Sequence, residues 1–130
     1  MKESSIMHRI QLACSGGASR LFRCNSGTAW QGYGPPVRVA QPTMILLNPG
    51  DVVIRQAQPL QMGLTTGCSD LIGWTQHSGL AVFTAIEVKS ATGRIRPEQS
   101  NFLERVRAAG GRAGIARSED DAKKIITGGG

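Results

Sequence analysis

The sequence predicts an α/β fold in which a mixed β-sheet is flanked by helices. Apolar residues at helical spacing open the chain over residues 3–14. Two strand-like segments then meet at a short turn over residues 76–79, and a helix, a strand and a last helix follow from residue 97 onward. Helices around a run of antiparallel strands, with one strand returning after a helix, are typical of a layered fold with a mixed sheet.

The first helix is predicted from Ile6 and Ile10, which recur on one helical face. Glu3 falls in the first turn, where a carboxylate complements the positive end of the helix dipole. Ser15-Gly16-Gly17 would end this helix, and residues 20–25 would form the first strand.

The middle of the chain is predicted to contain a hairpin of its own. Val37–Leu47 and Val52–Ala57 flank Asn48-Pro49-Gly50-Asp51, which is a strong turn sequence. Pro42 restricts the first arm to a sheet edge or a bulge. The neighbouring segments, residues 32–36 and 58–67, are expected to be loops.

The second predicted hairpin brings two carboxylates together. Residues 68–75 and 80–90 would pair around the turn at 76–79. Facing residues of such an antiparallel pair have numbers with a constant sum, here about 157. Asp70 and Glu87 satisfy that sum, so we expect their side chains to lie side by side.

The sequence of the last third of the chain predicts a helix, a strand and a second helix. Pro97 would begin a helix over residues 97–109, because proline is favoured at the first helical position. Gly110-Gly111 would end it, and residues 112–117 would form a short strand. Ser118 would cap the last helix, whose first turn is acidic and whose last turn carries lysines.

Charge and cysteine usage narrow the class of protein. The net charge of +6, from 15 basic and 9 acidic residues, favours a polyanionic partner such as nucleic acid, although it would serve solubility equally well. The cysteines Cys14, Cys24 and Cys68 form no C-x-x-C pair, which indicates a reduced, intracellular protein, and their spacing with His8 and His77 matches no zinc motif. No apolar run approaches the roughly 20 residues of a membrane span, so no membrane partner is expected.

The residues around Glu87 have the functional groups that metal-assisted phosphodiester hydrolysis requires. Glu87 and Lys89 alternate along one strand and therefore share a face. Two carboxylates and a backbone carbonyl would hold Mg²⁺ or Mn²⁺ through oxygen, and Lys89 would stabilise developing charge. Gln99, early in the following helix, would hold the water or a phosphate oxygen. By itself, Glu-x-Lys also fits a solvated strand face, and Gln99 also fits an exposed helix position.

Several short motifs follow one another in an order and at a spacing that together resemble one family. They are Gly63-Leu64, Gly67-Cys68-Ser69-Asp70-Leu71-Ile72-Gly73, Ile86-Glu87-Val88-Lys89-Ser90, Gly93-Arg94, Gln99, Gly110-Gly111 and Ser118-Glu119-Asp120. This combination resembles the VRR-NUC domain, the virus-type replication-repair nuclease branch of the PD-(D/E)XK superfamily. One departure from the superfamily signature is Ser69, which stands where a proline would precede Asp70, as is common in this branch.

The resemblance implies a restriction-endonuclease-like core and assigns roles to individual residues. It implies Asp70 and Glu87 as metal ligands with the carbonyl of Val88, Lys89 as the catalytic lysine, and Gln99 as a supporting glutamine. It also implies Glu3 as the first-helix glutamate that approaches the metal, and it places Arg23 within a strand motif. Apart from the resemblance, Arg94 and Arg96 directly follow the strand that carries Glu87, so they are, with Arg23, the candidates for DNA contact.

The function expected from this resemblance is that of a Mg²⁺- or Mn²⁺-dependent, structure-specific endodeoxyribonuclease. Short members of the family resemble Holliday-junction resolvases, so the expected substrate is branched DNA such as a four-way junction, cut by a homodimer. An intracellular location is expected, in the bacterial host cytoplasm if the protein is phage-encoded. Residues 1–127 would form one nuclease domain with a β-hairpin insertion at 34–58, which would serve a dimer interface or DNA contact, and residues 128–130 a disordered tail.

Three alternatives stay open at this point. The first is a DNA-binding protein that keeps the nuclease fold without catalysis. The second is a restriction-type enzyme that recognises a DNA sequence. The third is a structural or assembly protein. The complete set of Asp70, Glu87, Lys89 and Gln99 argues against the first and third. A length of 130 residues leaves little room for the recognition module that the second would need.

Overall fold

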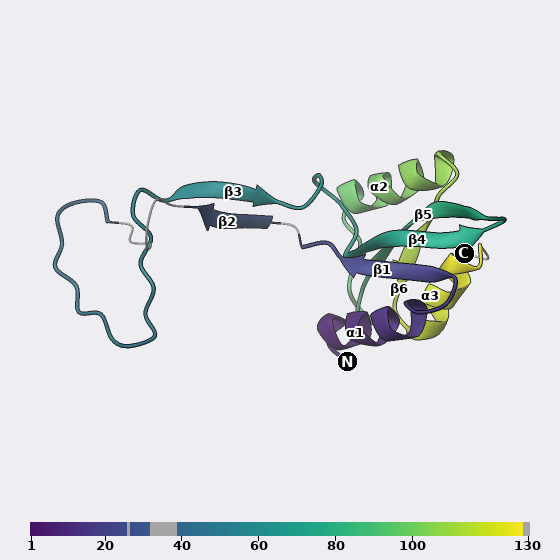
Figure 1. Cartoon of the computed structure of the whole chain (residues 1–130), viewed down its shortest axis with the longest axis horizontal. Helices are drawn as coiled ribbons and strands as arrows, with labels where there is room; N and C mark the ends of the chain where they lie inside the picture. The colour runs from purple at the N-terminus through teal and green to yellow at the C-terminus, as the bar shows by residue number, and fades with distance from the viewer. Residues whose placement is uncertain (26, 32–38, 129–130) are drawn as a thin grey trace. The chain divides into compact units, whose positions relative to one another are not determined.

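The computed structural model describes residues 1–25, 27–31 and 39–128 and divides the chain into two compact units. The first unit combines residues 1–26 with residues 63–130, and the second comprises residues 27–62 (Figure 1).

The first unit is a four-stranded mixed sheet with helices on both faces, as the sequence predicts. The sheet order is β1-β4-β5-β6, antiparallel except for the parallel pair β5 and β6. A parallel neighbour requires a crossover, which the second helix supplies. The strands are β1 (Ser19–Arg23), β4 (Leu71–His77), β5 (Leu80–Val88) and β6 (Arg112–Ala116), and the helices are α1 (Glu3–Cys14), α2 (Pro97–Ala108) and α3 (Glu119–Ile126).

Two hydrophobic clusters hold the helices to opposite faces of this sheet. Side chains from α1 and α3 meet Leu71 and Ile86 on one face, and Ile10 is fully buried there. Leu103 of α2 packs against Ala85 on the other face. The contacts of α2 are mainly with β5 and β6, so it covers one half of its face, and no helix of the described residues covers the half over β1 and β4 (Figure 1).

The predicted register of β4 with β5 is confirmed, whereas the predicted bounds of the first strand and of the turn are wrong, because β4 begins at Leu71 and continues through His77. Leu71 faces Ile86, and the turn that joins the strands contains Ser78 and Gly79. Both turn residues have positive φ angles, 52° and 77°, as a tight hairpin connection requires. The register continued by one position places Asp70 opposite Glu87.

The helix boundaries also agree with the sequence-based expectations. α1 spans the predicted residues, and Pro97 is the first residue of α2. The Ser118 hydroxyl accepts a hydrogen bond from the Asp121 N–H (3.1 Å) and so caps α3. Of the expected tail, residues 129 and 130 lie outside the described residues. None of the helices in the described ranges is long and apolar enough to cross a membrane.

The second unit contains a hairpin, but not the predicted one. Its strands are β2 (Gly27–Gln31) and β3 (Gln58–Met62), so the expectation of a loop over all of residues 58–67 is wrong. The predicted arms over 37–47 and 52–57 are also wrong, since residues 39–57 contain no more than an isolated bridge at Ile54. Residues 37 and 38 and the loop expected at 32–36 lie outside the described residues.

Local propensity misled the prediction because strands are stabilised mainly by what they pack against. Met44 and Leu46 are 97% and 87% exposed, so the apolar segment that suggested a strand has no surface of its own unit to bury it. The turn at residues 48–51 forms as expected: the Asp51 N–H donates to the Asn48 carbonyl (3.0 Å), and the Asn48 N–H donates to Asp51 Oδ2 (2.7 Å).

Candidate active site

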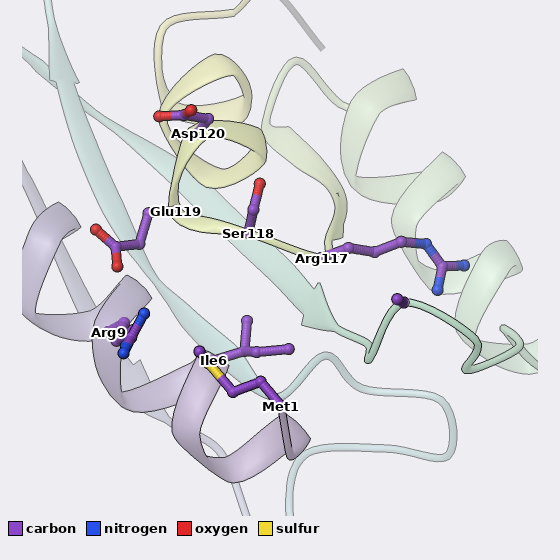
Figure 2. A pocket seen from close by; sticks show the side chains of 8 residues that line it. Met1, Ile6, Arg9, Arg117, Ser118, Glu119 and Asp120 are labelled. Carbon is purple, nitrogen blue, oxygen red and sulfur yellow. The ribbon is translucent and has the colours of Figure 1, made fainter.

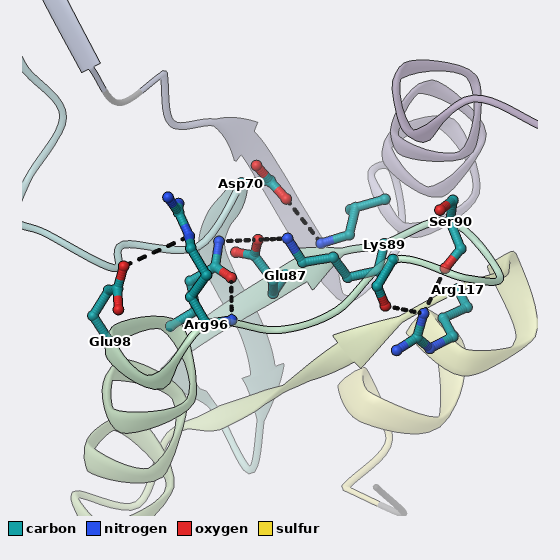
Figure 3. Close-up of polar contacts among 10 residues, drawn as sticks. Asp70, Glu87, Lys89, Ser90, Arg96, Glu98 and Arg117 are labelled. Carbon is teal, nitrogen blue, oxygen red and sulfur yellow. Dashed lines mark hydrogen bonds and ion pairs between the residues drawn. The ribbon is translucent and has the colours of Figure 1, made fainter.

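Glu87 is the centre of the polar cluster at the end of β5 (Figure 3). Its side chain is 2% exposed. The Oε1 atom accepts a hydrogen bond from Gln99 Nε2 (2.7 Å) and lies 3.3 Å from Lys89 Nζ. The Oε2 atom is buried and has no hydrogen-bond partner among the described residues. Because an unsatisfied buried carboxylate oxygen is costly, this atom indicates a place for an electropositive ligand.

Asp70 approaches the same point from the residue before β4. Its Oδ2 atom accepts a hydrogen bond from the Val88 N–H (2.9 Å), which ties the carboxylate to the last residue of β5. The sequence places Asp70 and Glu87 side by side, and the structure brings them together as predicted (Figure 3).

The electrostatics of this cluster favour a bound cation. Burial raises the pKa of Glu87 to about 7, and the neighbouring Asp70 carboxylate contributes to the rise. Lys89 opposes it, because its ammonium group stabilises the charged form of Glu87. The lysine therefore offsets only part of the cost of two carboxylates at one position.

Gln99 holds Glu87 in place through a helix cap. Its Oε1 atom accepts a hydrogen bond from the Arg96 N–H (2.9 Å), so its amide nitrogen is directed at Glu87. The same contact forms part of a capping box at the start of α2. Gln99 is 5% exposed, so the alternative of a solvated helix position is wrong.

Gly67 allows the loop before Asp70 to lie directly against the start of α2. Its φ angle is +83°, and an added Cβ would overlap the backbone carbonyl of Glu98, with 2.6 Å to the carbonyl carbon. This close approach sets the separation between the two elements that carry Asp70 and Gln99. Sequence reasoning had noted Gly67 only as part of a motif, and the spatial neighbour on α2 had no sequence signal.

Replacement of Gly67 by Ala is expected to lower both stability and cleavage. The variant has to move a backbone segment as well as adopt a positive φ angle. The matched control is Gly79→Ala, because Gly79 has a φ of +77° but open space around its Cα. Urea denaturation should show Gly67→Ala less stable than the control by about 1–3 kcal/mol, the usual cost of overpacking. Equal stability of the two variants would contradict a structural role for this contact.

Glu3 reaches the neighbourhood of the site but does not complete a three-carboxylate set. A Cβ at Gly93 would lie 3.4 Å from both Glu3 Oε2 and Lys89 Cδ, so the Glu3 carboxylate borders the loop that follows β5. Within the described residues, no group of three His, Cys, Asp or Glu side chains is arranged to hold a metal ion. The expected ligand role of Glu3 stays a prediction.

Arg117 fixes the loop that follows Lys89, and sequence reasoning missed this role. Its Nη1 atom donates to the carbonyl oxygens of Ser90 (2.5 Å) and Gly93 (2.8 Å) (Figure 3). An arginine between a strand and a helix cap gives no local signal of such a contact, because the two segments are far apart in sequence.

The arginines expected to contact DNA lie at the surface of the first unit. Arg23 is the last residue of β1 and is exposed. Arg94 is exposed in the loop before α2, and Arg96 forms an exposed ion pair with Glu98 (3.6 Å). Such an exposed pair is worth little and is readily exchanged for a phosphate contact.

The Cys68 thiol near the site is not an activated nucleophile. Cys24 and Cys68 contact each other with 3.3 Å between their Sγ atoms. Burial raises the pKa of the Cys68 thiol to about 11, and the Cys24 contact contributes. The thiol is therefore protonated at neutral pH, whereas nucleophilic attack needs the thiolate.

A hollow of about 400 Å³ lies apart from this cluster (Figure 2). It is formed by α1, the loop after β5 and the start of α3, and Ile6, Arg9 and Arg117 are among its lining residues. Asp70, Glu87, Lys89 and Gln99 are not among them.

The fold and the cluster together define a class of protein. A mixed sheet flanked by helices, with Asp70 before one strand and Glu87 and Lys89 at the end of the next, has the arrangement of a nuclease core. The family model for the VRR-NUC domain matches residues 51–120, more than half of the chain. The chain belongs to the VRR-NUC domain family, with a PD-(D/E)XK-like fold, and is a nuclease domain whose substrate is DNA.

The matched segment contains Asp70, Glu87, Lys89 and Gln99 but not Glu3 or Arg23. No curated protein and no solved structure matches the chain.

Proposed function

We propose that the chain is a Mg²⁺- or Mn²⁺-dependent endonuclease that acts as a homodimer on branched DNA, with four-way junctions as its preferred substrate. The family supplies the general activity of a DNA nuclease. The metal requirement, the preference for branched DNA and dimerisation go beyond that general activity.

The observation that supports the metal most directly is the unpartnered Oε2 atom of Glu87. It is buried beside a second carboxylate, and the cost of that arrangement raises the pKa of Glu87 to about 7. Hard divalent cations prefer oxygen ligands of this kind. Asp70, Glu87 and the Val88 carbonyl would hold the ion, which when bound supplies an activated water and offsets negative charge on the phosphate.

The chain's own residues would orient and stabilise the reacting groups. Gln99 and Lys89 occupy the Oε1 atom of Glu87, which leaves Oε2 as the oxygen directed to the ligand. The Val88 N–H holds the Asp70 carboxylate in place. The Lys89 side chain is 12% exposed, and a positive charge with so little solvent around it would stabilise a negatively charged phosphorane more strongly than an exposed one does.

Surface composition supports DNA contact and self-association. The exposed residues Arg23, Arg94 and Arg96 supply phosphate contacts on the unit that carries the site. The segment Met44-Ile45-Leu46-Leu47 is apolar, and all four residues are more than half exposed. Contiguous exposed apolar residues are typical of interfaces, and a two-fold dimer suits a two-fold symmetric junction.

The proposal is tested by cleavage of a substrate panel with Mn²⁺, Mg²⁺ or excess EDTA. Four-way junction, flap, splayed-arm and linear duplex DNA of matched sequence are compared. We expect metal-dependent cleavage with the four-way junction cut fastest. Cleavage in EDTA would contradict the metal requirement, and equal rates on linear duplex would contradict the branched preference.

Light scattering on the same preparation tests the dimer. We expect twice the mass of one chain, reduced to one chain by Leu46→Glu and unchanged by Leu12→Glu, an equally drastic change at an exposed position of α1. A DNA-binding protein without catalysis is the alternative function, and tight junction binding with no hydrolysis under any metal would favour it.

A further inference from the structure

The sheet face that α2 covers only in part carries a group of exposed aromatic side chains. Phe22 on β1, Trp74 on β4 and Phe83 on β5 are 46%, 44% and 44% exposed. The ring centroids of Phe22 and Trp74 lie 5.5 Å apart with an interplanar angle of 51°. Trp74 faces Phe83 across the strand pair, so the three rings cross neighbouring strands. Single exposed apolar residues are ordinary, whereas a group of three aromatic rings on one surface is not.

These rings lie on the same face of the sheet as the candidate active site. Side chains alternate along a strand, so Trp74 shares its face with Asp70, and Phe83 shares its face with Glu87. Leu71 and Ile86 point to the opposite face, where α1 and α3 pack. Trp74 lies four residues along the strand from Asp70, or about 13 Å.

A cation accompanies the rings. The Arg20 guanidinium lies 5.8 Å from the centroid of Phe22, and Arg20 faces Trp74 in the pairing of β1 with β4. Aromatic rings beside a guanidinium group are typical of surfaces that bind single-stranded nucleic acid, because bases stack on the rings while the cation attracts the backbone. The net charge of +6 favours such a polyanion over a purely apolar protein partner.

We propose that Phe22 and Trp74, with Arg20, form a stacking site for unpaired bases of the DNA strand that enters the site of Glu87. The inference rests on the proposed DNA substrate and specifies that the substrate has unpaired nucleotides a few positions from the bond that is cut. Paired bases within a duplex do not offer their faces in this way. The distance of about 13 Å between Trp74 and Asp70 along the β-strand corresponds to roughly four nucleotides of a stacked DNA strand.

Direct contact is tested by the fluorescence of Trp74. The chain has two tryptophans, so Trp30→Phe leaves Trp74 as the sole emitter. In EDTA, a dT oligonucleotide is expected to quench this emission at saturation, whereas blunt duplex of equal length is not. Unchanged emission on saturation with the dT oligonucleotide would overturn the proposal.

The energetic contribution is tested by the affinity of a labelled dT oligonucleotide measured by anisotropy. Trp74→Leu and Phe22→Leu keep an apolar side chain but lose the ring, and each is expected to weaken binding about tenfold, in the range measured for base stacking. Trp74→Phe is expected to retain most of the affinity, and Leu12→Ala on α1 serves as the exposed apolar control. Equal affinity for the Leu variants and wild type would overturn the stacking site.

Cleavage gives an independent readout. Weaker dT binding by the Leu variants, together with equal wild-type cleavage rates on junction and linear duplex, would leave this inference standing and contradict the branched preference. Normal binding of the dT oligonucleotide by both Leu variants, with junction cleavage intact, would overturn this inference and leave the proposed function standing.

Discussion

Asp70→Asn and Glu87→Gln are each expected to reduce metal-dependent cleavage by about 10³-fold or more. Each variant keeps the shape of the side chain but removes the negative oxygen that a divalent cation would require. Loss of several kcal/mol of charge stabilisation corresponds to a rate effect of this size. Single-turnover cleavage of a labelled junction at saturating Mn²⁺ measures the loss.

The control for these variants is Glu104→Gln, which changes an exposed carboxylate of α2. It should cleave at the wild-type rate. Retention of more than about a tenth of the wild-type rate by Glu87→Gln would show that this carboxylate is not essential to hydrolysis.

Glu87→Gln is also expected to make the protein more stable above pH 7 when divalent cations are absent. The folded protein raises the pKa of Glu87 from 4.5 to about 7, so between these values it holds a proton that the unfolded chain has released. The stability of the wild type therefore falls as pH rises through this window, and the cost is complete above pH 7. The uncharged amide that Glu87→Gln introduces avoids a cost of about 3 kcal/mol.

Urea denaturation of both proteins in EDTA at pH 8, 6 and 4.5 measures this difference. We expect it to be largest at pH 8 and small at pH 4.5, where the carboxyl group is protonated in the folded state and half protonated in the unfolded chain. Mn²⁺ at pH 8 should stabilise the wild type and not Glu87→Gln, because a ligand of the folded state shifts the unfolding equilibrium. If Glu87→Gln is less stable than the wild type at every pH, ionisation of Glu87 does not destabilise the folded protein.

The parts of the fold that could be predicted are those specified by local sequence. The turn at Ser78 and Gly79 fixes the register of β4 and β5, and that register is sufficient to place Asp70 beside Glu87. Pro97 and Ser118 mark helix starts for similarly local reasons. These signals depend on a few neighbouring residues and do not depend on contacts with distant parts of the chain.

The parts that could not be predicted depend on contacts between distant segments. The pairing of β2 with β3 joins residues separated by a long connection, and the apolar residues 44–47 suggested a nearer strand. The orientation of Gln99 follows from its contact with the Arg96 N–H, and the loop after Lys89 is held by Arg117 from another element. Sequence periodicity carries no information about either contact.

The cap formed by Gln99 has a consequence for the order of events during synthesis. The glutamine that directs Glu87 lies downstream of it in the chain, and it takes up its orientation through the Arg96 N–H as α2 begins. A growing chain that has emerged only as far as β5 has both carboxylates but lacks the group that directs Glu87. The candidate active site is therefore completed only after α2 has emerged and packed.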